Sequence, residues 1–371
     1  MSKAADLANL IGNINAGGGG VNRNLIINGA MSVSQRGTSF ADPSNDDYVL
    51  DRFIARKSND GAVTITQDSS APSGFANSLK VDVTTADTSI GANQFSMVQY
   101  KVEAQDLQTL AFGTSDAKNF TLSFYVKSNK TGTYAVNISQ ADNSSKQATL
   151  TYTINSSNTW ERKSLTFTGD TAGVINDDNG SGFGILWWLS AGTTFTSGST
   201  SATFQAYANA DHAAGHAVNL LDSTSNEWFI TGVQLEVGQN PTEFEHEPYE
   251  TTLRKCQRYL LRYPNDGGTN GGYTRYGISY SISSTETEVA IYPPVHMRVD
   301  PSLTHGGNAN SYYIWHANSD TALTSMSVEG GSTMEYIVVN AIASSGFSAG
   351  RAGSLNAYNN STNFLQFDAE L

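Results

Sequence analysis

The chain has 371 residues, of which 39% are hydrophobic and 15% are charged, and its net charge is -13. This length suggests two or three domains rather than one, and the excess of acidic side chains argues against a surface that binds nucleic-acid phosphates. The lone cysteine, Cys256, excludes an internal disulfide framework and a cysteine-based zinc site.

Residues 1–16 predict a short amphipathic helix at the N-terminus. Its apolar side chains recur at spacings of three and four and share one stripe: Leu7, Leu10, Ile11 and Ile14. The glycine-rich linker 17–21 separates this stripe from any local core, so we expect the peptide to dock on a partner. The N-terminus lacks the apolar run of a signal peptide, and no later stretch is long enough to span a membrane. We therefore expect a protein that is made in the cytoplasm and inserts into no membrane.

Residues 22–245 alternate between apolar and polar side chains. The pattern is clear in residues 120–126, where four apolar side chains point the same way: Phe120, Leu122, Phe124 and Val126. Similar alternation returns in residues 134–138, 183–189 and 229–237, with turn-like sequences between them. Many short strands without helices predict a β-sandwich.

Residues 246–268 break this alternation and predict a connecting helix over 248–263. Its predicted buried stripe recurs at spacings of four and three: Tyr249, Leu253, Cys256, Leu260 and Tyr263. Pro248 suits the first helical position, and Pro264 with the following glycines ends the helix. We expect this stripe to face another domain or another subunit.

Residues 269–371 return to alternation, for example at Tyr276, Ile278 and Tyr280. This region predicts a second, smaller β-sandwich of about one hundred residues. The chain as a whole is therefore predicted to be all-β.

Two sequence motifs bracket residues 22–263. The first is NRNLIINGAMSVSQRG at 22–37, followed by YVLDRF at 48–53. The second is WFITGVQLEVG at 228–238, followed by FEH at 244–246 and CQRY at 256–259. In this order they resemble the tail-fibre-like proteins of tailed bacteriophages, common among marine and cyanobacterial phages, whose large domain is similar to a carbohydrate-binding jelly roll.

The resemblance implies a jelly roll over residues 22–245. Such a fold brings its first and last strands together, so the two motifs should lie side by side. Arg52 is then expected to meet Glu236 or Glu245.

The resemblance also implies a virion structural protein, a homotrimeric tail fibre or spike subunit that recognises a host surface glycan. The N-terminal peptide would anchor it to other tail or capsid proteins, so the protein would sit on the surface of the phage particle. One alternative is a capsid decoration or tail component without glycan binding, because fold does not fix function. Another is a virion-bound polysaccharide depolymerase.

An enzyme would need a catalytic constellation, and a carboxylate pair for glycoside hydrolysis is the most plausible one. Asp46, Asp47, Asp177 and Asp178 are candidates, although adjacent carboxylates in such contexts are more often solvated turn residues. The spacing of His212 and His216 suits a metal only on a helix, and Gly215 disfavours that. We predict no enzyme and no cofactor, and leave a structural calcium ion open.

Glycan binding needs an exposed aromatic face, because a pyranose packs its C–H face on such a ring. Trp187 and Trp188 lie next to each other in a predicted strand and therefore point to opposite faces. Trp187 has the parity of the core residues Phe183 and Ile185, so Trp188 is the candidate platform unless a loop or subunit covers it. We assign Trp160, Trp228 and Trp315 to cores.

Overall fold

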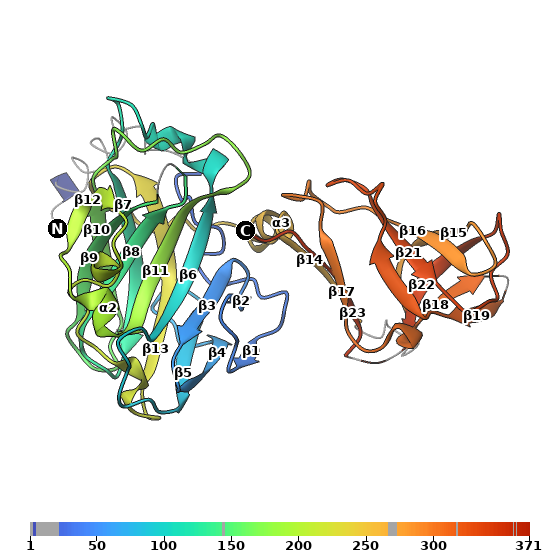
Figure 1. The fold of residues 1–371 in the computed structure, drawn as a ribbon, viewed down its shortest axis with the longest axis horizontal. Helices are drawn as coiled ribbons and strands as arrows, with labels where there is room; N and C mark the ends of the chain where they lie inside the picture. Colours follow the sequence, from blue (N-terminus) through green and yellow to red (C-terminus); the bar gives the residue numbers. More distant parts are fainter. Residues whose placement is uncertain are drawn as a thin grey trace. The chain divides into compact units, whose positions relative to one another are not determined.

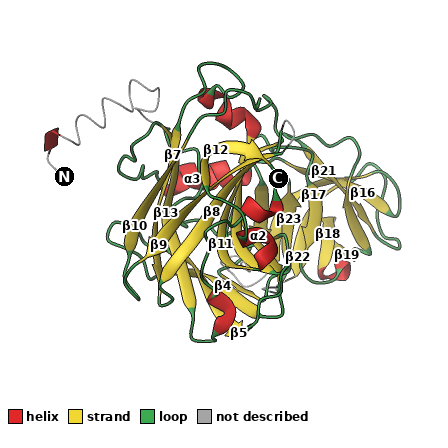
Figure 2. Cartoon of the chain, turned by 60° about the vertical axis from the view of Figure 1, so that its left-hand side comes forward, coloured by secondary structure: helices red, strands yellow, loops and turns green. Residues whose placement is uncertain are grey.

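The computed structural model describes residues 3–4, 22–142, 145–265, 273–316, 318–358, 360 and 362–371. The predicted anchor residues Leu7, Leu10, Ile11 and Ile14 and the glycine linker 17–21 lie outside them. The chain forms two compact units, unit 1 (Met1–Thr252 with Leu371) and unit 2 (Leu253–Glu370) (Figure 1). Figure 2 shows that strands and loops make up most of the described chain, as predicted for an all-β protein.

Unit 1 is a jelly-roll β-sandwich of two antiparallel sheets. The first sheet has the strand order β1 (Ser39–Ala41), β4 (Ala62–Asp68), β5 (Ser78–Thr85), β13 (Glu227–Val237), β7 (Phe120–Ser128) and β10 (Glu161–Phe167). The second has the order β12 (Ser201–Ala206), β9 (Lys146–Ile154), β8 (Gly132–Gln140), β11 (Ser181–Ala191), β6 (Phe95–Glu103), β3 (Phe53–Ser58) and β2 (Asp47–Tyr48). The short helix α2 (Thr193–Thr196) follows β11.

The core of unit 1 lies between these sheets and follows the predicted alternation. The four apolar side chains of 120–126 are all fully buried in it. Trp187 and Trp228 belong to the same core. Because burial of apolar surface is the main favourable term in folding, this core holds the sandwich together.

The two bracketing motifs lie side by side, as predicted. The Leu25 amide donates to the Leu235 carbonyl over 2.9 Å, and the Val233 amide donates to the Gly29 carbonyl over 2.9 Å. A Cβ on Gly29 would lie only 2.1 Å from the Val233 carbonyl oxygen, so glycine is required for this approach. The first motif is an irregular segment and not the expected strand.

The prediction that Arg52 meets Glu236 or Glu245 is wrong. Its guanidinium donates to the Lys101 carbonyl over 2.7 Å and lies over the Tyr100 ring. Glu236 instead accepts hydrogen bonds from Thr242, and Glu245 accepts one from the Asn24 amide.

The predicted helix over 248–263 is too long. Helix α3 spans Tyr249–Gln257, and strand β14 spans Leu260–Pro264. Strand β14 pairs with β23 (Phe364–Asp368), so the second half of the predicted connector belongs to the sheet structure of unit 2.

The predicted buried stripe is therefore only partly correct. Cys256 and Leu260 are buried, Leu253 and Tyr263 are half-buried, and Tyr249 is 54% exposed. Leu260 and Tyr263 matched the helical spacing by coincidence, because β14 supplies them from an extended backbone.

Unit 2 contains two antiparallel sheets. The smaller has the order β14, β23, β17 (Ser302–His305). The larger has the order β19 (Ser319–Ala322), β18 (Tyr312–His316), β22 (Ala352–Tyr358), β15 (Tyr273–Ser281), β16 (Glu286–Ile291), β21 (Ile337–Ile342) and β20 (Ser325–Val328). Both sheets contribute to one hydrophobic core, for example through Phe367 and Leu355.

Candidate functional site

The outer face of the seven-stranded sheet of unit 1 carries side chains that do not belong to the main core. Met97 lies opposite Arg56 and Trp188 on the neighbouring strands, and Gln99 lies opposite Leu186. Residues that are directly opposite in antiparallel strands share a face. This face is therefore a floor made of apolar, aromatic and amide side chains.

Trp188 lies on this face, as its parity predicts. Of the two alternatives left open for it, an exposed platform and a side chain covered by a loop, the structure shows the second, because Trp188 is fully buried. Helix α2, in the segment after β11, packs against that strand and helps to cover Trp188. The rings of Phe195 and His212 lie 5.3 Å from the Trp188 ring, measured between centroids. Trp188, Met97, Leu186 and their neighbours form a second, smaller apolar cluster.

The covering segment leaves a cavity of about 330 Å³ beside Trp188. Three further rings line it: Phe95, Phe195 and Tyr207. Its polar lining residues come from β3, β6 and the β8–β9 hairpin: Arg56, Gln99, Ser139, Gln140, Ser145 and Lys146. Tyr207 is 46% exposed, so part of this residue is accessible from solvent.

Two lining side chains carry buried polar atoms without a hydrogen-bond partner among the described residues. They are Trp188 Nε1 and His212 Nε2. An unpaired polar atom costs free energy when it is buried. A ligand with hydroxyl groups would supply partners for these atoms.

The two basic side chains that line the cavity are each paired with an acidic side chain. Arg56 donates to Gln99 Oε1 over 2.7 Å and forms an ion pair of 3.0 Å with Asp46. Lys146 forms an ion pair of 2.7 Å with Asp170. Burial alone would raise the pKa of the Asp170 carboxyl, but the hydrogen bond from Lys146 outweighs it and lowers that pKa.

His212 is neutral at physiological pH. Burial, assisted by the positive charge of Arg56, lowers its pKa to about 4. The cavity therefore presents one imidazole that hydrogen-bonds without carrying a charge.

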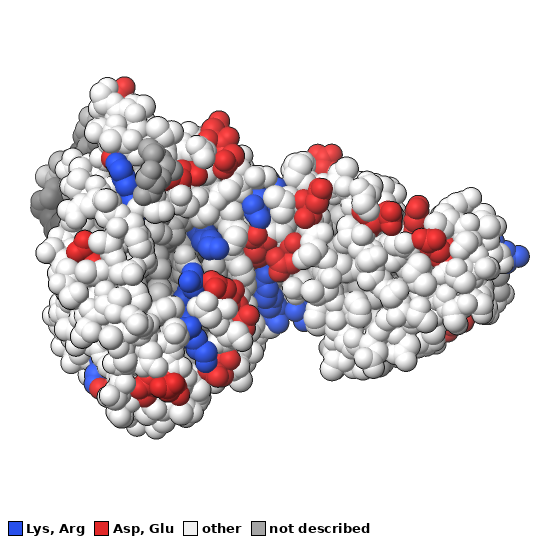
Figure 3. Space-filling view, in the orientation of Figure 1, with Lys and Arg blue, Asp and Glu red and all other residues white. Residues whose placement is uncertain are grey.

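In the space-filling view, basic and acidic side chains alternate around strands β3 and β6 of unit 1 (Figure 3).

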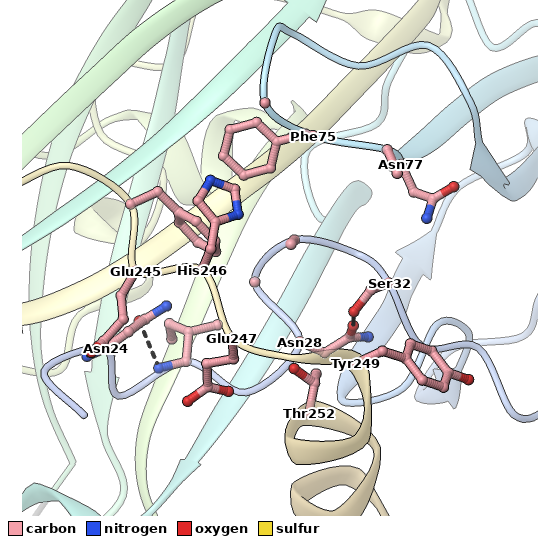
Figure 4. Close-up of a pocket in the computed structure, with 16 residues that line it drawn as sticks. Asn24, Asn28, Ser32, Phe75, Asn77, Glu245, His246, Glu247, Tyr249 and Thr252 are labelled. Atoms are coloured by element: carbon pink, nitrogen blue, oxygen red, sulfur yellow. Dashed lines mark hydrogen bonds between the residues drawn. The ribbon is translucent and has the colours of Figure 1, made fainter. Parts of the chain in front are cut away.

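A second cavity of unit 1, about 210 Å³, lies where the two bracketing motifs meet. The Phe75 and His246 rings face each other on one side of it, and Thr252 lies in the first turn of α3 on the other (Figure 4). Asn28 is buried there, and its Oδ1 accepts a hydrogen bond from the Val33 amide over 2.9 Å. These contacts tie the motifs together, and we assign this cavity a structural role.

Three of the four candidate catalytic carboxylates lie in turns or bends, and Asp47 begins the short strand β2. Asp177 and Asp178 are exposed, and Asp178 accepts the Gly180 amide in a tight turn. Asp46 pairs with Arg56 and Asp47 accepts the Ser44 amide. All four carboxylates are among the described residues, and no hydrogen bond links Asp46 or Asp47 to Asp177 or Asp178.

Neither histidine of the predicted pair sits in a metal site. Burial lowers the pKa of His216 to about 4, and its Nδ1 accepts the Ala135 amide over 3.2 Å. Within the described ranges, three or more acidic, cysteine or histidine side chains nowhere gather as they would around a metal ion. The helices that the structure describes include none with the length and apolarity of a membrane span.

Sequence reasoning missed most of the cavity. Phe195 and Tyr207 lie in a stretch without strand or helix periodicity, and Gln99 and Arg56 point outward from strands whose other face is core. The only available signal was the outward parity of Trp188.

No protein-family model and no curated protein matches the sequence. Among solved structures, the chain is similar to the enzymatically active domain of tailspike protein 4 of bacteriophage CBA120, with 11% identity, a TM-score of 0.32, and coverage of 58% of this chain and 21% of that one. The chain thus spans about a fifth of that tailspike domain.

Two carbohydrate-binding modules are also similar. The family 11 module of a cellulosomal cellulase of Clostridium thermocellum has 12% identity and a TM-score of 0.29, with 56% of this chain and 98% of the module covered. A xylan-binding domain of family 22 has 13% identity and a TM-score of 0.30, with 56% and 98% covered. All three TM-scores are low, so no property of these proteins is transferred to this chain.

Proposed function

We propose that unit 1 binds a glycan in the cavity beside Trp188. The observation that carries the proposal is the combination of an exposed tyrosine, Tyr207, with unpartnered polar atoms on Trp188 and His212. Sugar recognition requires this combination, because the C–H face of a pyranose packs on a ring while its hydroxyls need both donors and acceptors.

Each group has a distinct task in this proposal. The Tyr207 ring stacks on the sugar, and its hydroxyl is held by Asn209 Oδ1 over 2.7 Å, which fixes the ring. The Trp188 indole N–H donates to a sugar hydroxyl, and Nε2 of the neutral His212 imidazole forms a hydrogen bond with another. Trp188 thus acts through its N–H edge and not through an exposed ring face.

We further propose that the chain is a virion surface protein, a homotrimeric tail fibre or spike subunit that displays this cavity toward the host. The two bracketing motifs support the phage origin, since they resemble tail-fibre-like proteins. The apolar stripe of residues 7–14 on its glycine tether supports attachment to the particle, because it has no local core to pack on.

Substitution of Tyr207 tests the glycan site. Tyr207→Ala should weaken binding to a printed panel of bacterial envelope polysaccharides by about 1 to 3 kcal/mol, as expected for loss of a stacking ring. Tyr249→Ala is the matched control, because Tyr249 is also exposed in unit 1 but lines the other cavity. Equal binding by wild type and Tyr207→Ala, or no binding to any polysaccharide, would contradict the site.

Deletion of residues 2–16 tests the virion role. The shortened chain should fold and assemble normally but should no longer incorporate into phage particles, which mass spectrometry of purified virions measures. Incorporation at the normal copy number would show that attachment does not use this peptide.

A further inference from the structure

The outer face of the larger sheet of unit 2 gathers a second set of aromatic and charged residues. Arg275 lies opposite Asn356, which lies opposite Tyr313 on the next strand. One register step away, Trp315 lies opposite Asp320. These residues share one face. Together they line a cavity of about 390 Å³: Tyr273, Arg275, Tyr313, Trp315, Asn318, Asp320 and Asn356.

The aromatic wall of this cavity is partly accessible. Trp315 is 41% exposed and Tyr273 is 58% exposed. The sequence assignment of Trp315 to a core is therefore wrong. The Tyr313 ring is buried behind them, 5.6 Å from Tyr273 and 4.4 Å from Tyr358 between ring centroids. Tyr313 thus fixes two tyrosines that flank it.

The charged ends of two side chains in the cavity have no hydrogen bond or ion pair among the described residues: those of Arg275 and Asp320. The Arg275 guanidinium lies over the Trp315 ring, 5.7 Å from its centroid. The guanidinium is therefore oriented by the indole while its N–H donors stay available.

We propose that unit 2 carries a second saccharide site, which takes a sugar unit bearing a carboxylate. The ring of the sugar packs on Trp315 and Tyr273, and its carboxylate pairs with Arg275 in the bidentate geometry that guanidinium favours. Asp320 accepts from a sugar hydroxyl. A single cation matches one carboxylate and not the repeated phosphates of a nucleic acid.

This site is independent of the cavity in unit 1, because it uses none of the same residues. Unit 1 offers mainly neutral hydrogen-bonding groups, since its Arg56 and Lys146 are paired with acidic side chains. The two cavities should therefore select different sugars, an uncharged one in unit 1 and an acidic one in unit 2.

The test uses the full chain and a panel of acidic and neutral bacterial polysaccharides, together with carboxyl-reduced forms of the acidic ones. We expect at least one acidic polysaccharide to bind and its carboxyl-reduced form to bind at least tenfold more weakly. Trp315→Ala and Arg275→Gln should each weaken the acidic interaction at least tenfold. Arg275→Lys should restore part of it, because lysine keeps the charge but not the fork of donors.

Two controls separate this proposal from the one for unit 1. Tyr292→Ala removes another exposed ring of unit 2 outside the cavity and should leave binding unchanged. Tyr207→Ala should leave the Trp315-dependent binding unchanged. The second site is wrong if no acidic polysaccharide binds, if carboxyl reduction does not weaken binding, or if Trp315→Ala binds like wild type, whatever the result for Tyr207.

Discussion

The outer faces of the two seven-stranded sheets differ in what covers them. In unit 1, Trp188 points outward and is fully buried, because the segment after β11 lies over it. In unit 2, Trp315 also points outward but is 41% exposed. Ile278 on the same face of that sheet is 74% exposed.

Hydrogen bonds fasten the cover in unit 1. Gln147 donates to the Ala208 carbonyl and Thr149 to the Asp211 carbonyl, each over 2.7 Å. The polar side chains that alternate with core residues on β9 therefore hold a covering loop instead of facing water. Strand parity tells which face a residue is on, but only such long-range contacts decide whether that face is buried.

The largest expected effect is the loss of Trp188. Trp188→Ala should lower the free energy of unfolding of unit 1 by about 3 to 5 kcal/mol, because a buried indole leaves a cavity behind. Trp315→Ala should lower the free energy of unfolding of unit 2 by clearly less, because the Trp315 ring is 41% exposed. Urea denaturation followed by circular dichroism and limited proteolysis separates the two units. Similar losses for both variants would contradict the difference in coverage.

A smaller contrast exists within unit 2, between two leucines of the predicted helical stripe. Leu260→Ala should cost about 2 to 5 kcal/mol, because Leu260 is fully buried in strand β14. Leu253→Ala should cost clearly less, because Leu253 is half-buried on α3. Thermal unfolding of both variants measures the difference. Equal costs would favour a continuous buried helix over the observed helix and strand.

These two leucines also show why the sequence predicted only part of the structure. Alternation correctly located β7, β8, β11 and β13, because their buried face repeats every second residue. Residues 248–263 satisfied a helical spacing, and nothing local revealed that residues 260–264 pair with β23, about a hundred positions later.

The candidate sites were harder to predict for the same reason. The cover of Trp188, residues 193–217, is held by single side-chain contacts without any period. In unit 2, Arg275, Trp315 and Asp320 come from three strands that only the sheet order brings together. The face of Trp188 could be predicted, because strand parity depends only on neighbouring residues. Its burial could not be predicted, because the loop that covers it comes from later in the chain.

The pH dependence of stability should also distinguish the two units. Burial holds the pKa of His212 and of His216 at about 4 in the folded chain, against about 6.5 when unfolded. The unfolded chain therefore binds more protons between these values, so stability is complete above pH 6.5 and falls as the pH drops toward 4. Each histidine should account for up to about 3 kcal/mol of this loss in unit 1.

The check is urea denaturation of unit 1 at a series of pH values. A His212→Gln, His216→Asn double variant should show a much flatter profile, since asparagine also offers an acceptor to the Ala135 amide. A steep loss that persists in the double variant would assign the pH dependence to other groups.

The smallest expected effect concerns the uncovered face itself. Ile278→Thr should change the free energy of unfolding of unit 2 by less than about 0.5 kcal/mol, because the side chain is 74% exposed and threonine keeps the β-branch that suits a strand. Ile291→Thr is the matched control, since Ile291 lies in the neighbouring strand β16 but faces the core. Burying a hydroxyl there should cost about 1 to 3 kcal/mol. Light scattering on the same samples reports the mass of the assembly. If Ile278→Thr instead lowers stability or dissociates an oligomer, the exposed face of the single chain is covered by a second copy, and the homotrimer proposed here would form through unit 2.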